Sequence, residues 1–238
     1  MKIIRRLFLL PFLFLYISCN PQGLDCVKET KYGKFKYCEN DLNTISDLIR
    51  VCDEKLLTIS SELNLQINDP VIIEVYPNQE EYSRNIMNPG LKESPAISGN
   101  GIIQIVSPKS KIKTDSIKYE DRLMFLVHEY IHILIDKLNN TPPIFIDEGI
   151  ASYYSSFAFY KSSAQKYVKQ INFIPTIEQL KNHYYKLPAP DLFSFLFIDF
   201  IVELEDKSIL REILRHPEMI DKDELNDKWQ RFIEVNYY

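Results

Sequence analysis

Hydrophobic residues in the first half of the chain follow two different spacings. Between Asp41 and Leu63 they recur every three or four positions, which predicts an amphipathic helix. Val71–Tyr76 and Ile102–Val106 are short runs rich in β-branched residues, and both predict strands. The pair Asn100-Gly101 separates the second run from a strand-like stretch before it. This pair predicts a tight turn between two paired strands.

The second half of the chain is predominantly helical in pattern. A long apolar helix is predicted from about Ser116 to Leu138, and the polar stretch Asn139–Pro143 ends it. Further helices are predicted along the rest of the chain, at Ile144–Tyr160, Ala164–Gln170, Thr176–Tyr185, Asp191–Glu205, Lys207–Arg215 and Asp223–Val235. Strands that come first and helices that follow predict an α+β fold. In this fold a small N-terminal sheet packs against a mostly helical C-terminal half.

The first 18 residues have the pattern of an export signal. Three basic residues among the first six precede an apolar run, Leu7–Ile17, which is too short to span a bilayer as an ordinary helix. Ser18 and then Cys19 follow, an order that resembles a bacterial lipoprotein signal. We therefore expect Cys19 to carry a lipid anchor in the bacterial cell envelope, and Asn20 favours the outer membrane. An ordinary secretory signal cut near Ser18 is the alternative.

Charge argues against one class of partner. The chain has a formal net charge of −5 at pH 7, and removal of the basic leader makes the remainder more negative. The sequence has no concentrated patch of Lys and Arg with interleaved aromatic residues. Binding of nucleic acid through a basic face is therefore not expected.

Three cysteines follow the leader, namely Cys26, Cys38 and Cys52. In an oxidising compartment two of them can pair, but the sequence does not say which one is left over. No C-x-x-C spacing is present, so a metal site built from cysteines is the less favoured interpretation.

The strongest candidate for chemistry is the stretch from His128 to His132, which reads H-E-x-x-H within the long apolar helix. Residues four apart lie on the same face of a helix, so both imidazoles can bind one metal ion. Glu129 lies beside them and can act on a water molecule at the metal. Histidines buried in such an apolar helix need polar partners, which a metal ion supplies.

A third ligand is predicted in the next helix. His132 precedes the end of its helix by roughly 9 Å, and Glu148 lies roughly 7 Å into the following helix. If the Asn139–Pro143 turn folds the two helices antiparallel, these side chains arrive at nearly the same level. Two imidazoles and one carboxylate leave a fourth zinc position open, as in catalytic sites. Asp147 is the alternative ligand.

The motif at His128–His132, followed by the stretch Pro142–Tyr153, resembles the gluzincin metallopeptidases, especially the small peptidase MA-like domains. The similarity covers roughly Val71 to the C-terminus and is specific at residues 127–154. It implies a zincin-like fold with one Zn²⁺ held by His128, His132 and Glu148. It also implies that Glu129 is the general base and proton shuttle.

The resemblance implies two further parts of the site. In the family, a strand before the active-site helix pairs with extended substrate, and Ile102–Val106 matches it. Gly99, Gly101, Ile102 and Ile103 are therefore the predicted substrate-binding residues. Gluzincins commonly stabilise the oxyanion with a Tyr or His that follows the Glu ligand. Several candidates for this donor stay open: His183, Tyr153, Tyr154, Tyr184 and Tyr185.

These predictions divide the chain into a signal peptide (residues 1–18), an N-terminal extension with one helix (19–66) and a zincin-like catalytic domain (67–238). The expected activity is zinc-dependent hydrolysis of peptide bonds in a peptide or protein substrate, by a membrane-anchored lipoprotein. A lipoprotein that keeps the fold as a binding or assembly module, without turnover, is the alternative. Hydrolysis of a non-peptide amide by the same zinc site is a third possibility.

Overall fold

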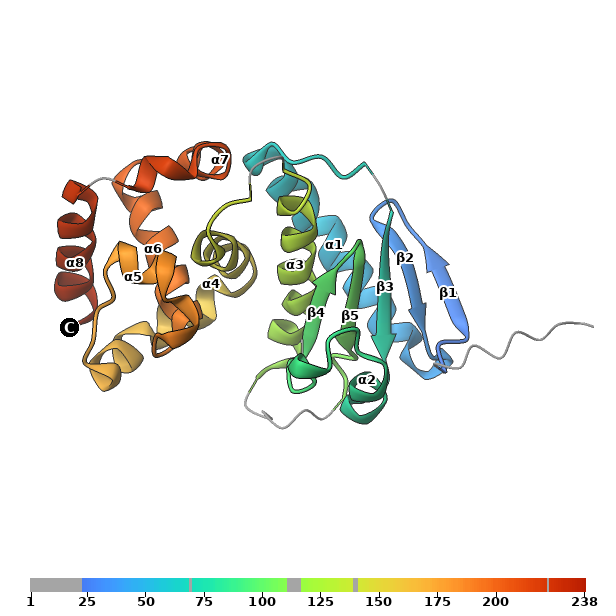
Figure 1. Cartoon of the computed structure of the whole chain (residues 1–238). Coiled ribbons are helices and arrows are strands. Elements are labelled where there is room, and N and C mark those ends of the chain that lie inside the picture. The colour runs from blue at the N-terminus through green and yellow to red at the C-terminus, as the bar shows by residue number, and fades with distance from the viewer. Residues whose placement is uncertain (1–22, 69, 111–116, 139–140, 222) are drawn as a thin grey trace, which may run out of the picture.

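A mixed five-stranded sheet forms the N-terminal half of the chain, with strand order β1-β2-β3-β5-β4 (Figure 1). β2, β3 and β5 are parallel, and β1 and β4 are antiparallel edge strands. The strands are β1 (Cys26–Glu29), β2 (Gly33–Tyr37), β3 (Val71–Tyr76), β4 (Ala96–Gly99) and β5 (Ile102–Val106). This computed structural model describes residues 23–68, 70–110, 117–138, 141–221 and 223–238. The predicted signal peptide and Cys19 lie outside the described residues.

Eight α-helices accompany this sheet in the described part of the chain: α1 (Leu42–Leu63), α2 (Gln79–Asn85), α3 (Tyr119–Ile135), α4 (Ile144–Ile171), α5 (Ile177–Asn182), α6 (Pro190–Leu204), α7 (Ile209–Arg215) and α8 (Asp223–Tyr237). The order of strands and helices confirms the predicted α+β fold, with α4 to α8 forming the helical C-terminal half (Figure 1). Within the described residues, none of these helices has both the length and the apolar character needed to cross a membrane.

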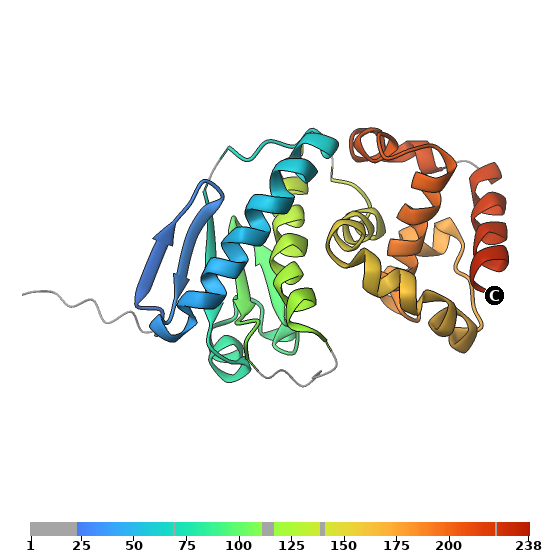
Figure 2. The same ribbon diagram turned by 180° about the vertical axis from the view of Figure 1, so that it is seen from behind.

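Helices α1 and α3 cover one face of the sheet, as Figure 2 shows from behind. Alternate residues of β3 and β5 point toward these helices, and Ile73, Val75, Ile103 and Ile105 have no exposed surface. The segment predicted to be an N-terminal extension belongs to this layer. It contributes β1, β2 and α1, and β2 pairs with β3 along its length.

The β4–β5 hairpin confirms the predicted turn. Asn100 and Gly101 have φ angles of 52° and 74°, and a type I′ turn requires positive φ at both central positions. The turn sets the register in which Gly99 lies opposite Ile102. β4 is thereby held at the edge of the sheet, beside α3.

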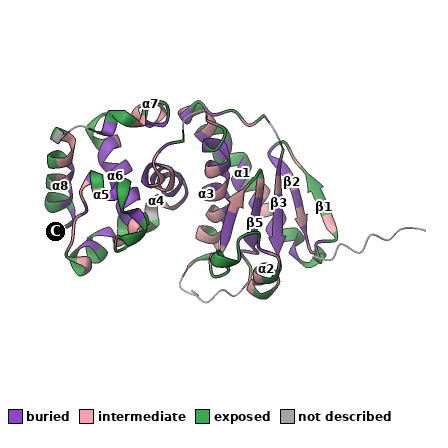
Figure 3. Ribbon diagram, in the orientation of Figure 1, coloured by how far each residue is buried: buried purple, intermediate pink, exposed green. Residues whose placement is uncertain are grey.

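The helical half is organised around α6, whose residues Leu192–Ile201 are all buried (Figure 3). Three of these residues, Phe193, Phe195 and Phe197, are aromatic and completely buried. One predicted boundary was wrong: the break expected between Tyr160 and Ala164 is absent, and α4 is instead divided into two helical stretches at Ser156. A bend at Ser156, whose φ and ψ are −131° and 19°, interrupts its helical geometry.

Candidate metal centre

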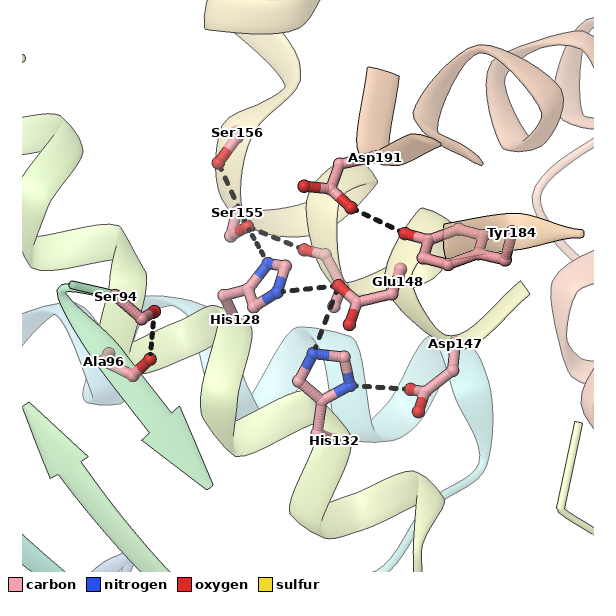
Figure 4. A network of polar contacts seen from close by, with 11 residues as sticks. Ser94, Ala96, His128, His132, Asp147, Glu148, Ser155, Ser156, Tyr184 and Asp191 are labelled. Atoms are coloured by element: carbon pink, nitrogen blue, oxygen red, sulfur yellow. Dashed lines mark hydrogen bonds and ion pairs between the residues drawn. The ribbon is translucent and has the colours of Figure 1, made fainter. Parts of the chain in front are cut away.

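The candidate metal centre lies where α3 and α4 meet. His128 and His132 are one turn apart on α3, and their ring centroids are 4.7 Å apart. Glu148 comes from the second turn of α4. The two helices are not antiparallel, contrary to the prediction. In Figure 1 the first turns of α4 are seen nearly end-on, while α3 runs up the page. The three side chains nevertheless converge (Figure 4).

The distances between the three side chains fit a divalent metal ion. Oε2 of Glu148 lies 3.4 Å from Nε2 of His128 and 3.7 Å from Nε2 of His132. Two ligand atoms that each lie about 2.0–2.1 Å from zinc at tetrahedral angles are about 3.3 Å apart. One candidate ligand atom from each residue lies within 4.8 Å of the other two. The donor set of two imidazoles and one carboxylate is one that zinc accepts.

Asp147 holds the other side of the His132 ring. Its Oδ1 lies 2.8 Å from Nδ1 of His132 and therefore accepts a hydrogen bond from that nitrogen. Nε2 of the ring then faces Glu148 and His128. A carboxylate on the second nitrogen fixes the ring and raises its basicity as a ligand. Asp147, the alternative ligand from the sequence, thus contacts the nitrogen that does not face the site.

Ser155 holds His128 in a similar way. Its Oγ donates to the carbonyl of Ala151 at 2.7 Å and lies 3.3 Å from Nδ1 of His128. Because the hydroxyl proton is used on Ala151, the oxygen can accept from Nδ1, and Nε2 of His128 is the ring nitrogen that faces Glu148. A serine bonded to the carbonyl four residues earlier also tends to bend a helix, and the bend at Ser156 follows directly.

Excess negative charge at the centre favours a cation. Burial alone lowers the pKa of His132, but the hydrogen bond to Asp147 and the charges of Asp147, Glu148 and Glu129 outweigh it and raise this pKa to about 9. Burial acts to raise the pKa of Glu148, yet the two histidines hold it below its usual value. Without a metal, the carboxylates therefore keep a proton on His132. A divalent cation would replace that proton.

Gly149 lets α6 approach the metal ligands. A Cβ at this position would lie 2.6 Å from the carbonyl oxygen of Ser194 and 2.7 Å from Cγ1 of Ile198. Only glycine fits between the two helices at this point. Gly149, the residue after Glu148, thus allows α6 to pack closely against α4. This packing keeps Asp191, in the first turn of α6, close to the site.

Tyr184 is the candidate oxyanion donor that the structure brings beside Glu148 (Figure 4). Its hydroxyl donates to Oδ1 of Asp191 at 2.6 Å. Burial and then the charges of Asp191 and Glu148 raise its pKa far above the usual value, so the hydroxyl keeps its proton.

The other candidate donors lie elsewhere. The hydroxyl of Tyr154 donates to Glu62 on α1 at 2.8 Å. Tyr153 lines the same pocket as Glu62 and stacks against Phe195. His183 and Tyr185 are exposed to solvent.

The predicted substrate-binding strand needs a correction. β5 lies inside the sheet, with β3 on one side and β4 on the other. The backbones of Ile102 and Ile103 are therefore already paired and cannot pair with a substrate. Gly101 serves the turn through its positive φ. Of the predicted set, only Gly99 lies in β4, the strand at the free edge of the sheet.

Comparison with known proteins adds no family assignment. No protein-family model matches the sequence, and no curated protein matches it either. The assignment of chemistry therefore rests on the geometry of the site.

Ser155 and the pairing of Tyr184 with Asp191 are not among the features predicted from the sequence. A signal for Ser155 was present, since it follows Glu148 by seven residues, which is two helical turns. Polar residues at that spacing share a helix face with the ligand. The contact between Tyr184 and Asp191 joins a short turn to the next helix, and local spacing carries no signal for it.

Proposed function

We propose that this chain is a zinc-dependent peptidase of the gluzincin type. The observation that carries the proposal is the convergence of His128, His132 and Glu148 at separations that suit one tetrahedral zinc ion. The partners of the two rings support it, because Asp147 and Ser155 leave both Nε2 atoms free to bind a metal. A set of two imidazoles and one carboxylate leaves one position for water, as hydrolysis requires.

Zinc bound at this site would lower the pKa of a water molecule and polarise the scissile carbonyl. Glu129, the neighbour of His128 on α3, is the base that takes the proton from the attacking water and passes it to the leaving amine. Glu129 lies close enough to His132 and Tyr82 for its charge to act on both. The charge of Glu129 adds to the raised pKa of His132, and it follows burial in raising that of Tyr82.

Tyr184 is the donor that we assign to the developing oxyanion. Asp191 holds the protonated hydroxyl of Tyr184 beside Glu148. The hydroxyl can turn from the Asp191 carboxylate to a substrate oxygen. Tyr153 and Tyr154 are less suited to this role, because Tyr154 donates to Glu62 and both rings lie under the Lys207 ammonium group.

The substrate backbone pairs with β4 in this proposal. The amide of Val106 donates to the carbonyl of Pro95, so Ala96 and Ser98 direct their N–H and C=O groups away from β5. The hydroxyl of Ser94 donates to the carbonyl of Ala96 at 2.7 Å, so this carbonyl already has one hydrogen-bond partner. Figure 4 shows Ser94 and Ala96 beside His128, so a peptide added to this edge would run past the metal ligands.

The cellular location that we propose follows from the predicted signal peptide. A lipid on Cys19 would anchor the protein in the bacterial cell envelope, with the outer membrane as the expected site and a peptide or protein of that compartment as the substrate. Nucleic acid is not a partner in this proposal. The competing function is a lipoprotein that keeps the fold as a binding or assembly module.

Glu129→Gln separates these two functions. The variant keeps all three ligands, so wild type and variant should bind equal amounts of zinc, and only wild type should cleave a broad peptide library. Absence of cleavage by zinc-loaded wild type across the library would favour the binding module.

A further inference from the structure

A pocket on the helical half lies around His183. A capping box begins α5: the amide of Gln179 donates to Thr176 Oγ1, and the amide of Thr176 donates to Gln179 Oε1. Gln179 and His183 are four residues apart and therefore point to the same side. The pocket has a volume of about 490 Å³. Its lining consists of Phe173, Gln179, His183, Lys186, Leu187 and Pro188.

The lining combines an apolar surface with two basic side chains. None of the six residues is acidic, and neither His183 nor Lys186 forms an ion pair with any residue that the structure describes. The pocket on the other side of α5 differs, because Lys181 there is bound to Asp221 at 2.7 Å. In a chain with a net charge of −5, a pocket with an unneutralised lysine and no carboxylate suits an anionic ligand.

Tyr184 connects this pocket to the metal centre. It lies between His183 and Lys186 in the chain, and its side chain turns inward to Asp191 beside Glu148 (Figure 4). An extended peptide advances about 3.3 Å per residue. A substrate residue several positions from the scissile bond would have to occupy the pocket while the bond lies at the candidate metal ligands.

We infer that this pocket binds a carboxylate of the substrate, with Lys186 and His183 as its donors and Phe173 and Leu187 as the contact for the adjoining apolar atoms. The inference rests on the proposed peptidase function and adds a specificity site to it. The carboxylate belongs either to an acidic side chain or to the C-terminus of the peptide. The chemistry of recognition is the same for both.

Binding of three labelled peptides tests this inference. The zinc-loaded chain carries Glu129→Gln so that bound peptides stay intact, and fluorescence anisotropy measures their affinity. Three fluorescein hexapeptides differ only at the last residue: a glutamate amide, a glutamine amide and a glutamine with a free carboxylate. The test variant adds Lys186→Glu. The matched control adds Lys166→Glu, which makes the same charge change at an exposed position of α4.

At least one carboxylate peptide should bind about fivefold to tenfold more tightly than the glutamine amide. Lys186→Glu should abolish this preference, and Lys166→Glu should keep it. A preference for the glutamate amide assigns the carboxylate to a side chain, and a preference for the free acid assigns it to the C-terminus. Equal affinity for all three peptides, or a preference that survives Lys186→Glu, would overturn the inference.

Cleavage of the same peptides by the chain with Glu129 intact is measured separately. Cleavage without any carboxylate preference would overturn the pocket and leave the peptidase proposal standing. A preference that depends on Lys186, with no cleavage of these peptides or of a broad library, would overturn the peptidase proposal and retain the pocket as a carboxylate site.

Discussion

Asp147 and His132 are joined by a contact of 2.8 Å between Oδ1 and Nδ1, while Glu148, the next residue on α4, faces Nε2 of the same ring at 3.7 Å. Consecutive residues of a helix point about 100° apart. This divergence lets two neighbouring acids hold opposite sides of one imidazole. In the proposed site the two acids have different roles: Glu148 would be a ligand, and Asp147 would position and polarise the His132 ring.

Asp147→Asn tests that division of roles. The variant keeps a hydrogen-bond acceptor for Nδ1 but loses the charge, so zinc affinity should fall about 10-fold to 100-fold. Competition against a chromophoric chelator measures the change. Ser155→Ala serves as the comparison and should cost less, because its contact with His128 is neutral and longer, at 3.3 Å. Wild-type affinity in Asp147→Asn would contradict the assignment.

Zinc affinity should depend on pH in one direction. The pKa of His132 is raised to about 9 in the metal-free chain, so zinc must displace a proton at any lower pH. Apparent affinity should therefore rise by about tenfold per pH unit up to about pH 9 and then level off. Calorimetry in two buffers of different ionisation enthalpy should show about one proton released per zinc at pH 7.5. An affinity that is flat between pH 7 and 9 would contradict this account.

Gly149→Ala should destabilise the fold. The added Cβ meets the backbone oxygen of Ser194 at 2.6 Å, and backbone cannot move aside as the end of a flexible side chain can. Loss of about 1–3 kcal/mol in the free energy of unfolding is expected, measured by urea titration. Gly99→Ala is the matched control, because its nearest neighbour is the Met87 sulfur at 3.9 Å. Equal stability of the two variants would show that α4 and α6 do not require glycine here.

Tyr184→Phe should lower activity without removing the metal. The hydroxyl contacts Asp191 and none of the three proposed ligands, so zinc content should equal that of wild type. The value of kcat should fall about 100-fold if the hydroxyl stabilises the oxyanion. Tyr154→Phe removes an equivalent hydroxyl, bonded to Glu62, and should leave kcat within about threefold of wild type. Equal kcat in both variants would exclude Tyr184 as the donor.

The cysteines should remain reduced. All three that the structure describes are free thiols. Cys26 packs against the main core. Cys38 packs against a smaller cluster around Tyr76 and Tyr82, and its thiol donates to the carbonyl of Gly23 at 2.7 Å. Burial raises the pKa of Cys52 to about 12 and keeps its thiol inert. A thiol reagent should modify Cys26 and Cys38 in the native protein, and Cys52 only after unfolding. A disulfide found by mass spectrometry would contradict this arrangement.

The three candidate ligands were predictable because each depends on local spacing. His128 and His132 share a helix face whatever surrounds them, and Glu148 needs only a short turn between two helices. The crossing of α3 and α4 was not predictable, because packing against the sheet and α6 decides it. For the same reason β5 was mistaken for the edge strand. The pattern of a strand does not show which of its two sides another strand covers.

The position of the kink in α4 was missed for a different reason. Ser155 and Ser156 sit within the helix, and the bend depends on the bond from Ser155 to Ala151 and the contact with His128. The first is a side-chain hydrogen bond and the second is a tertiary contact, and the spacing of hydrophobic residues predicts neither. Tyr184 could be named as one candidate among five, but only its contact with Asp191 distinguishes it from the others.

Metal content of the purified mature chain tests the central claim most directly. Mass spectrometry of the metal in wild type, His132→Ala and Glu148→Ala gives the zinc bound per chain, and circular dichroism establishes that each variant is folded. We predict about one zinc per wild-type chain and loss of most of it in both folded variants. Wild type without zinc after exposure to the metal, or full zinc content in folded Glu148→Ala, would contradict the account.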